Sequence, residues 1–394
     1  MSETALLAVA IAGAAGLVAG RLWVRGGGAG GSPRPAFRSS PHYTQGLHYL
    51  AAGQVNLAIS ELTKVTHEDP AALEVQLVLG NLLRESGQVE RAVGVHQGLT
   101  ERSDLTRAER VHALACLGMD FRKAGFLDRA SRTFDEVLAV DPKNLHALEG
   151  LKKLCEEQRQ WREAFDVQKR ISGLRKSDDR LVLGHLQAKL GEEAAAAEKR
   201  DVAEAAFHAA LALDHRVLPA HLGLAALYED RDPLRAAAFL EEAIEVAPDR
   251  AYLSFETLER TYAAAGQATR FASLCERLID AQPRDWRARL ALARHLAARG
   301  ELDEALGLTL RALEANPQVL AAHVEAWRIL RRRGLPAAEV ERYTREAEQA
   351  VFYRDPHVCT ACRYRADSML WRCPHCHEWD TLVEERLAPP VPSH

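Results

Sequence analysis

Four cysteines near the C-terminal end of the sequence have the spacing of a metal site. Cys359 and Cys362 form one C-x-x-C pair, and Cys373 and Cys376 form a second pair after ten intervening residues. Two such pairs can place four sulfur atoms around one point, which is the ligand set of structural zinc and of iron–thiolate centres. The alternative for these pairs is two redox-active disulfides. We predict one metal ion held by Cys359, Cys362, Cys373 and Cys376.

The predicted site is structural rather than catalytic, because four protein ligands leave no open position for water or substrate. Iron in the same ligand set would carry one electron at a time, and the sequence does not separate iron from zinc. A domain this small needs its metal in order to fold. We expect the metal-binding domain to span residues 351–385 and a loose, proline-rich tail to follow at residues 386–394.

The middle of the chain repeats a glycine that is followed five residues later by an alanine. The copies begin at Gly53, Gly87, Gly125 and Gly300, and Gly266 and Gly334 lie one period before and one period after Gly300. The period, about 34 residues, is that of the tetratricopeptide repeat, a pair of packed helices. Glycine ends the first helix in a left-handed turn, and a proline such as Pro70, Pro142, Pro248, Pro283 or Pro317 ends the second helix.

The fold class that follows is all-α, a superhelical solenoid of about nine repeats over residues 41–350, because one helix pair cannot bury its apolar face alone. The repeat is weaker in the centre, where the expected turns begin at Arg159 and Arg200 without glycine and where residues 230–236 match poorly. The first helices of the pairs should line a surface that binds peptides or proteins.

The first 25 residues predict a transmembrane anchor. The segment from Thr4 to Gly20 has no charged residue, and arginines follow it from Arg21 onward. A helix from Thr4 to Val24 would span about 31 Å, enough for a bilayer core. One alternative is a cleaved signal peptide, but it should carry its positive charge before the apolar stretch. The other is a peripheral or unstructured leader, because alanine and glycine make the segment only weakly hydrophobic. Positive charge after the anchor predicts a single-pass protein whose remainder is cytoplasmic.

Two small residues of the anchor, Gly16 and Gly20, have the G-x-x-x-G spacing that lets membrane helices pack closely. The pair could bind another membrane helix, or a second copy in a homo-oligomer, although an alanine- and glycine-rich segment also produces such pairs by chance. Residues 26–40 are rich in glycine, serine and proline, a composition typical of a flexible linker.

Composition and motifs argue against several functions. The net charge of −4 gives no basic excess for nucleic acid. The histidines are dispersed, and we find neither a phosphate-binding glycine loop nor a nucleophile-elbow serine, so the chain is not expected to be an enzyme. The remaining cysteines, Cys116, Cys155 and Cys275, lie at apolar helix positions and are expected to be buried thiols, which fits a reducing compartment.

These features together resemble the lipopolysaccharide assembly protein B family of Gram-negative bacteria. The most specific stretches are LGNLLRESGQVERA at residues 79–92, VHQ at residues 95–97 and WRCPHCHEW at residues 371–379. The terminal module of the family is rubredoxin-like, and its four cysteines match the four predicted ligands. Rubredoxin turns often have glycine after the second cysteine of each pair, whereas this chain has Arg363 and His377 there, a departure that argues against redox-active iron.

The resemblance implies a function that spacing alone does not. Members of the family regulate lipopolysaccharide synthesis at the inner membrane by helping the membrane AAA protease (FtsH) degrade the deacetylase that commits precursors to lipid A (LpxC). We therefore expect a membrane-anchored adaptor with these two proteins as partners. The alternatives are a general repeat scaffold for envelope assembly and an iron–thiolate redox protein.

Overall fold

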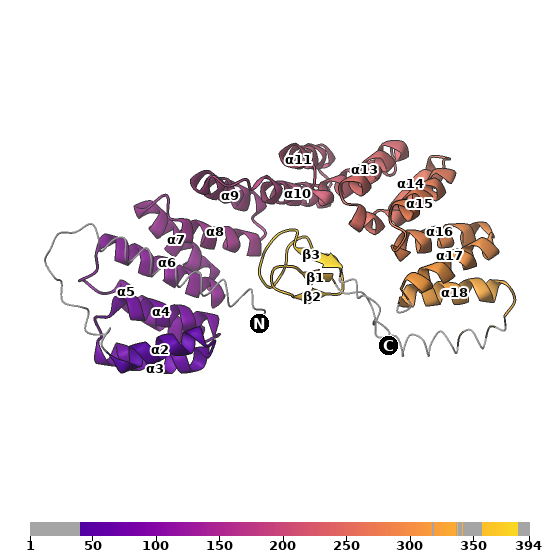
Figure 1. The fold of residues 1–394 in the computed structure, drawn as a ribbon. Helices are drawn as coiled ribbons and strands as arrows, with labels where there is room; N and C mark the ends of the chain where they lie inside the picture. Colours follow the sequence, from indigo (N-terminus) through magenta and orange to yellow (C-terminus); the bar gives the residue numbers. More distant parts are fainter. Residues whose placement is uncertain (1–39, 317–318, 336, 338–340, 342–356, 385–394) are drawn as a thin grey trace, which may run out of the picture. The chain divides into compact units, whose positions relative to one another are not determined.

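The computed structural model describes residues 40–316, 319–335, 337, 341 and 357–384 (Figure 1). The chain forms two compact units, Met1–Asp178 and Asp179–His394, which are described separately. Both units consist of helix pairs, and the second also contains a small sheet. This is the predicted helical-repeat architecture, with a small domain that carries the four cysteines in its C-terminal part.

The first unit holds four helix pairs in its described residues, and the two helices of each pair pack against each other. The helices are α2 (Pro41–Ala51), α3 (Val55–Glu68), α4 (Leu73–Glu85), α5 (Val89–Thr100), α6 (Arg107–Lys123), α7 (Leu127–Val140), α8 (Leu145–Glu157) and α9 (Trp161–Arg175). Successive first helices also meet, since α4 contacts α6 and α6 contacts α8.

The second unit continues the pattern and ends in the small sheet. Its described helices are α10 (Arg180–Ala196), α11 (Arg200–Leu213), α12 (Leu218–Tyr228), α13 (Pro233–Val246), the 3₁₀ helix η2 (Pro248–Leu253), α14 (Phe255–Ala264), α15 (Thr269–Ala281), α16 (Trp286–Arg299), α17 (Leu302–Ala315) and α18 (Leu320–Arg332). The strands are β1 (His357–Cys359), β2 (Arg365–Ala366) and β3 (Leu382–Glu384), and β1 pairs antiparallel with both neighbours.

The predicted glycine turns are confirmed. All six glycines have positive φ between 70° and 104° and stand between the two helices of a pair or, for Gly334, directly after α18: Gly53, Gly87, Gly125, Gly266, Gly300 and Gly334. In the centre Arg159 takes the same left-handed conformation with φ of 59°. The turn predicted to begin at Arg200 was placed two residues too late, because the left-handed residue is Glu198 and Arg200 already begins α11.

Prolines mark the ends of second helices as predicted. The helices α3, α7 and α15 each end two residues before Pro70, Pro142 and Pro283, respectively. Pro248 likewise follows the end of α13 by two residues, but it begins η2 rather than the loop before the next α-helix. The sequence did not predict this extra turn. Pro317 lies outside the described residues.

Close packing between pairs depends on glycines that face aromatic rings. Phe134 of α7 is fully buried, and a Cβ atom added to Gly118 of α6 or Gly150 of α8 would lie 2.7 Å or 2.3 Å from its ring. Phe207 has the same relation to Gly191 and Gly223. The ring of one second helix therefore fills the space that glycines leave on two successive first helices.

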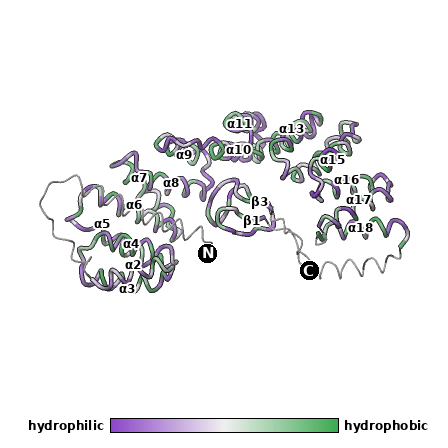
Figure 2. The backbone as a smooth tube through the Cα atoms, viewed as in Figure 1, coloured by the Kyte–Doolittle hydropathy of each residue, from purple (hydrophilic) through white to green (hydrophobic). Residues whose placement is uncertain are grey.

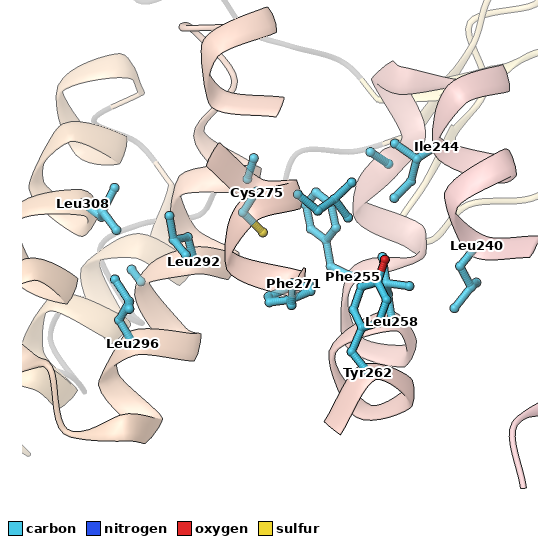
Figure 3. Close-up of a cluster of buried hydrophobic side chains, with 14 of the residues drawn as sticks. Leu240, Ile244, Phe255, Leu258, Tyr262, Phe271, Cys275, Leu292, Leu296 and Leu308 are labelled. Carbon is cyan, nitrogen blue, oxygen red and sulfur yellow. The ribbon is translucent and has the colours of Figure 1, made fainter. Parts of the chain in front are cut away.

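The apolar residues of each pair join into clusters along the unit. Figure 2 shows hydrophobic and hydrophilic residues interspersed along the helices, as expected for helices that bury one side. The largest cluster of the second unit joins α12 to α18, and Figure 3 shows Phe255, Leu258, Tyr262 and Phe271 gathered in it. The predicted burial of Cys116, Cys155 and Cys275 is confirmed.

Replacing Gly150 with alanine is expected to destabilise the first unit by about 1–3 kcal/mol, because the new methyl group would overlap the buried Phe134 ring. Gly94 in α5 is the control, since a Cβ there meets no atom within 4 Å and alanine should stabilise the helix by about 0.5–1 kcal/mol. Urea denaturation followed by circular dichroism would measure both changes. Equal effects of the two substitutions would contradict the packing argument.

The predicted membrane anchor at residues 1–25 and linker at residues 26–40 fall almost wholly outside the described residues. Within the part that the structure describes, no helix combines the length and apolar character required to cross a bilayer.

Candidate metal centre

The structure brings Cys359, Cys362, Cys373 and Cys376 together. Their four sulfur atoms all lie within 4.8 Å of one another, and the Cys359–Cys376 and Cys362–Cys373 Sγ distances are both 3.6 Å. Four sulfurs placed about 2.3 Å from a central metal would be about 3.8 Å apart. A disulfide needs about 2.05 Å, and all four thiols are free. The arrangement fits one tetrahedral metal ion better than two disulfides.

The two cysteine pairs lie in two turns of the same construction. In the first turn the Arg363 N–H donates to the Cys359 carbonyl at 2.9 Å, and in the second the His377 N–H donates to the Cys373 carbonyl at the same distance. Arg363 and His377 both have φ of 63°, the left-handed conformation that usually favours glycine. The departure from the rubredoxin pattern is therefore one of residue type, not of backbone conformation.

The surroundings of Cys359 favour a thiolate. The side chain is fully buried, which opposes ionisation, but the Thr381 hydroxyl 3.2 Å from its sulfur and the backbone N–H groups of Cys362 and Ala361 lower its pKa to about 6. Burial raises the pKa of Cys376, whose sulfur lies 3.6 Å from that of Cys359. The thiolate that these groups favour at Cys359 is the form of cysteine that binds a metal ion.

A small apolar core surrounds the cysteines. Cys359, Cys373 and Leu382 are fully buried, and Met369 and Leu370 pack against them. Among the residues that the structure describes, no other group of three or more histidine, cysteine, aspartate or glutamate side chains has its ligand atoms this close together. The predicted ligands are thus assembled at the centre of the only core that this small domain has in the described structure.

The metal domain packs on the repeats of its own unit. The His185 ring of α10 stacks on Trp379 with centroids 5.5 Å apart, and Arg250 of η2 pairs with Asp380 at 2.5 Å. The Tyr252 hydroxyl lies 2.8 Å from Nε2 of His357, and Arg287 of α16 pairs with Glu384. We call His185, Arg250, Tyr252 and Arg287 the docking residues.

The sequence did not predict the docking residues, and it left open whether the metal domain packs on the repeats or on a partner. They come from three separate elements, and each is an ordinary residue type for a helical surface. The proline before Arg250 and Tyr252 gives no separate signal, because Pro248 has the same spacing as the prolines that end other second helices, and only the structure shows that it begins η2.

Docking is expected to weaken as the pH falls from about 6.5 to about 4. His185 is 1% exposed, and burial lowers its pKa to about 4. The imidazole of the undocked form would titrate near 6.5, so between these pH values the undocked form binds one proton more than the docked form. Each fall of one pH unit therefore stabilises the undocked form relative to the docked form by about 1.4 kcal/mol. Burial lowers the pKa of His357 as well, with the same sign. The charged groups that act on His185 are Asp380, Arg250, Lys189 and Asp214.

Hydrogen exchange in residues 357–384, corrected for the intrinsic effect of pH, would measure this dependence. Metal content is determined at each pH so that docking is compared only among loaded samples. His185→Phe is the matched control, because the ring can still stack on Trp379 but cannot titrate. An equally steep dependence in this variant would show that His185 is not its main source.

Comparisons with known proteins agree with this architecture. Residues 357–384 match the family model described as a rubredoxin metal binding domain, and residues 43–103 and 260–319 match the tetratricopeptide repeat model. The chain is 25% identical over 350 residues to lipopolysaccharide assembly protein B of Escherichia coli strain K12, covering 88% of this chain and 90% of that protein. A protein of the same name from Haemophilus influenzae strain Rd is 24% identical over 363 residues, with 87% and 89% covered.

Proposed function

Because this chain belongs to the family of lipopolysaccharide assembly protein B, we propose that it regulates lipopolysaccharide biosynthesis as an adaptor rather than as an enzyme. It presents the deacetylase that commits precursors to lipid A (LpxC) to the membrane AAA protease (FtsH). The names of its relatives support the lipopolysaccharide role, and the repeat architecture supports a function in protein binding.

In this proposal Cys359, Cys362, Cys373 and Cys376 hold one structural metal ion, either zinc or iron. The bound ion supplies cross-linking of four thiolates, which stabilises a domain too small to fold on its own core. The domain then keeps Asp380, Glu384 and the ring of Trp379 in position for the docking residues. Its role is to brace the repeats, so no electron transfer is required.

The adaptor works at the inner membrane. Residues 1–25 form its single-pass anchor, and the repeats and the metal domain lie on the cytoplasmic side. The uncharged segment from Thr4 to Gly20 and the arginines after it support this orientation. Gly16 and Gly20 offer a contact surface for another membrane helix, either that of the protease or that of a second copy.

The observation that carries the proposal is the surface of the second unit on which the metal domain packs. The domain holds η2 and α16 through ion pairs and hydrogen bonds, and a groove of about 580 Å³ remains beside these contacts. Contacts with the metal domain hold this surface in place, and its groove is suited to binding a protein segment. The described residues that line the groove do not form a catalytic arrangement.

Depletion of the protein in its own cells tests the function. The half-life of the deacetylase should lengthen and lipopolysaccharide should accumulate, and both should return when the full chain is restored. A chain that lacks residues 1–25 should restore neither. Unchanged deacetylase half-life and lipopolysaccharide level after depletion would overturn the proposal.

A further inference from the structure

The groove in the second unit is formed by first helices of successive pairs. Residues of α14, α16 and α18 line it, together with Phe271 of α15, Tyr252 of η2 and, from the metal domain, Glu384 of β3. Phe255 and Phe271 also belong to the buried cluster of Figure 3, so this wall of the groove is fixed by the core. The groove is therefore a preformed feature of the folded unit.

The bottom of the groove is apolar and partly formed by small residues. Trp286 of α16 is partly exposed and offers apolar surface, Leu290 of α16 lines the groove from an almost wholly buried position, and Ala291 of α16 and Ala321 of α18 are small. A leucine or phenylalanine side chain placed there would bury apolar surface, and this burial favours binding. The apolar part of the groove thus calls for an apolar side chain in the ligand.

Two arginines that line the groove, one from α16 and one from α18, share a single carboxylate. Arg294 and Arg328 are separated by one repeat period, so they occupy equivalent positions in successive pairs. Both approach the same oxygen of Glu325, Oε2, at 3.3 Å and 3.4 Å. The Glu325 side chain is buried, whereas the two arginine side chains are 49% and 66% exposed. One carboxylate cannot neutralise two guanidinium groups, so this pair of arginines keeps excess positive charge and several N–H donors for a second carboxylate.

The part of the lining that comes from α14 has the opposite charge. Glu256 and Glu259 are its two carboxylates, and Glu259 pairs with the ring of His295 at 2.7 Å. Arg287 and Glu384 lie beside each other and compensate each other's charge. A polyanion such as nucleic acid would meet these glutamates, which argues against it. A ligand that places one carboxylate beside the two arginines need not place negative charge on these glutamates.

We propose that this groove binds an extended segment of a partner protein in which an acidic side chain adjoins an apolar one. The carboxylate bridges Arg294 and Arg328, and the apolar side chain lies on Trp286, Leu290 and Ala291. This proposal rests on the proposed adaptor function because it assumes that the ligand is a protein segment. Peptide binding to the purified chain can nevertheless be measured whether or not this chain binds the deacetylase.

The chain supplies a matched control for the two arginines. Arg260 lies one repeat period before Arg294, at the equivalent position of α14, but it pairs with its own carboxylate, Glu229, and does not line the groove. Glu325→Gln changes the charge of the groove in the opposite direction to the arginine substitutions, because it removes the carboxylate that the two arginines share and leaves both cations in place.

The experiment measures fluorescence polarisation of two labelled decapeptides with the full chain in detergent. Both peptides are glycine and serine with a central leucine pair, followed by aspartate in one and by asparagine in the other. Wild-type protein should bind the aspartate peptide at least about tenfold more tightly. Arg294→Gln with Arg328→Gln should reduce this preference to about twofold or less, Arg260→Gln should leave it unchanged, and Glu325→Gln should increase it.

Helical signal and metal content are measured for every variant, so that a misfolded sample is recognised. Because the double arginine variant leaves Glu325 buried without its cations, the triple variant with Glu325→Gln is measured beside it and should lose the preference as well. Equal binding of the two peptides to wild-type protein, no binding of either up to about 1 mM, or an equal effect of Arg260→Gln would overturn the proposal.

Discussion

Cys373→Ser is expected to remove the metal ion from the chain and to unfold residues 357–384. Cys373 is fully buried at the centre of the cluster, and its sulfur lies 3.6 Å from that of Cys362. Structural zinc contributes about 10–16 kcal/mol to the folding of such small domains, far more than the apolar core around Leu382 could replace. Metal analysis should show one ion per wild-type chain and almost none in the variant.

The helices of the repeats should survive this change, because their clusters do not include the cysteines of the metal domain. Circular dichroism should therefore lose little helical signal. Hydrogen exchange should rise throughout residues 357–384 and locally around Arg250 and Arg287, which lose the carboxylates of Asp380 and Glu384. Arg287 also pairs with Asp285 at 3.3 Å, so it keeps one carboxylate partner after Glu384 is lost.

Cys275→Ala is the control for the loss of a thiol. Cys275 is fully buried in the apolar cluster of the second unit, where burial raises the pKa of its thiol to about 12. This substitution should cost some stability by leaving a small cavity but should leave the metal content unchanged. Wild-type metal content in Cys373→Ser would show that the four cysteines do not form the site. The colour of the loaded protein would separate iron from zinc, since ferric thiolate absorbs visible light.

Features encoded by a short stretch of sequence were predicted well. The spacing of the cysteines correctly indicated that four sulfurs meet, because each pair is a turn fixed by hydrogen bonds between residues four or five positions apart. The glycine turns were likewise predicted from single residues. The turn at Glu198 was misplaced because glutamate, unlike glycine, does not indicate a left-handed turn in a sequence. Only its φ and its hydrogen bond to the end of α10 reveal that conformation.

Contacts between distant residues could not be predicted. Arg250 and Asp380 are 130 residues apart, and Tyr252 and His357 are 105 residues apart. Neither pair follows from a periodicity, because the extra turn η2 carries Arg250 and Tyr252 outside the repeat pattern. The shared carboxylate of Arg294 and Arg328 is an intermediate case, since their spacing by one repeat period is visible in the sequence but the position of Glu325 between them is not.

The first unit also contains a contact between distant residues that the sequence did not predict, where three ionisable side chains from three helices meet. Asp120 of α6 is fully buried and accepts hydrogen bonds from Arg84 of α4 at 2.9 Å and from Nδ1 of His96 of α5 at 2.5 Å. Burial alone would lower the pKa of His96, but the hydrogen bonds to Asp120 and Cys116 raise it to about 9. Nothing in the sequence indicated this triad beyond a histidine in an ordinary helix position.

Asp120→Ala is expected to destabilise the first unit by about 3–5 kcal/mol, because it leaves Arg84 and His96 buried without their shared counter-ion. Hydrogen exchange of α4, α5 and α6 should increase together. In the wild type the contribution of His96 should be fully present below about pH 6.5 and should be lost as the pH rises through about 9, since its pKa is raised by folding. Urea denaturation between these pH values would measure that loss.

An apolar replacement of the whole triad tests whether charge is needed for stability. His96 rests on Gly80, where an added Cβ would lie 2.4 Å from Nε2, just as Phe134 rests on Gly118. The combination His96→Phe, Asp120→Leu and Arg84→Met should therefore recover most of the stability that Asp120→Ala loses, and it should no longer depend on pH near 9. If the combined variant is as unstable as Asp120→Ala, the ion pairs themselves stabilise the unit. If Asp120→Ala leaves hydrogen exchange in α4, α5 and α6 unchanged, the triad contributes nothing to the stability of these helices.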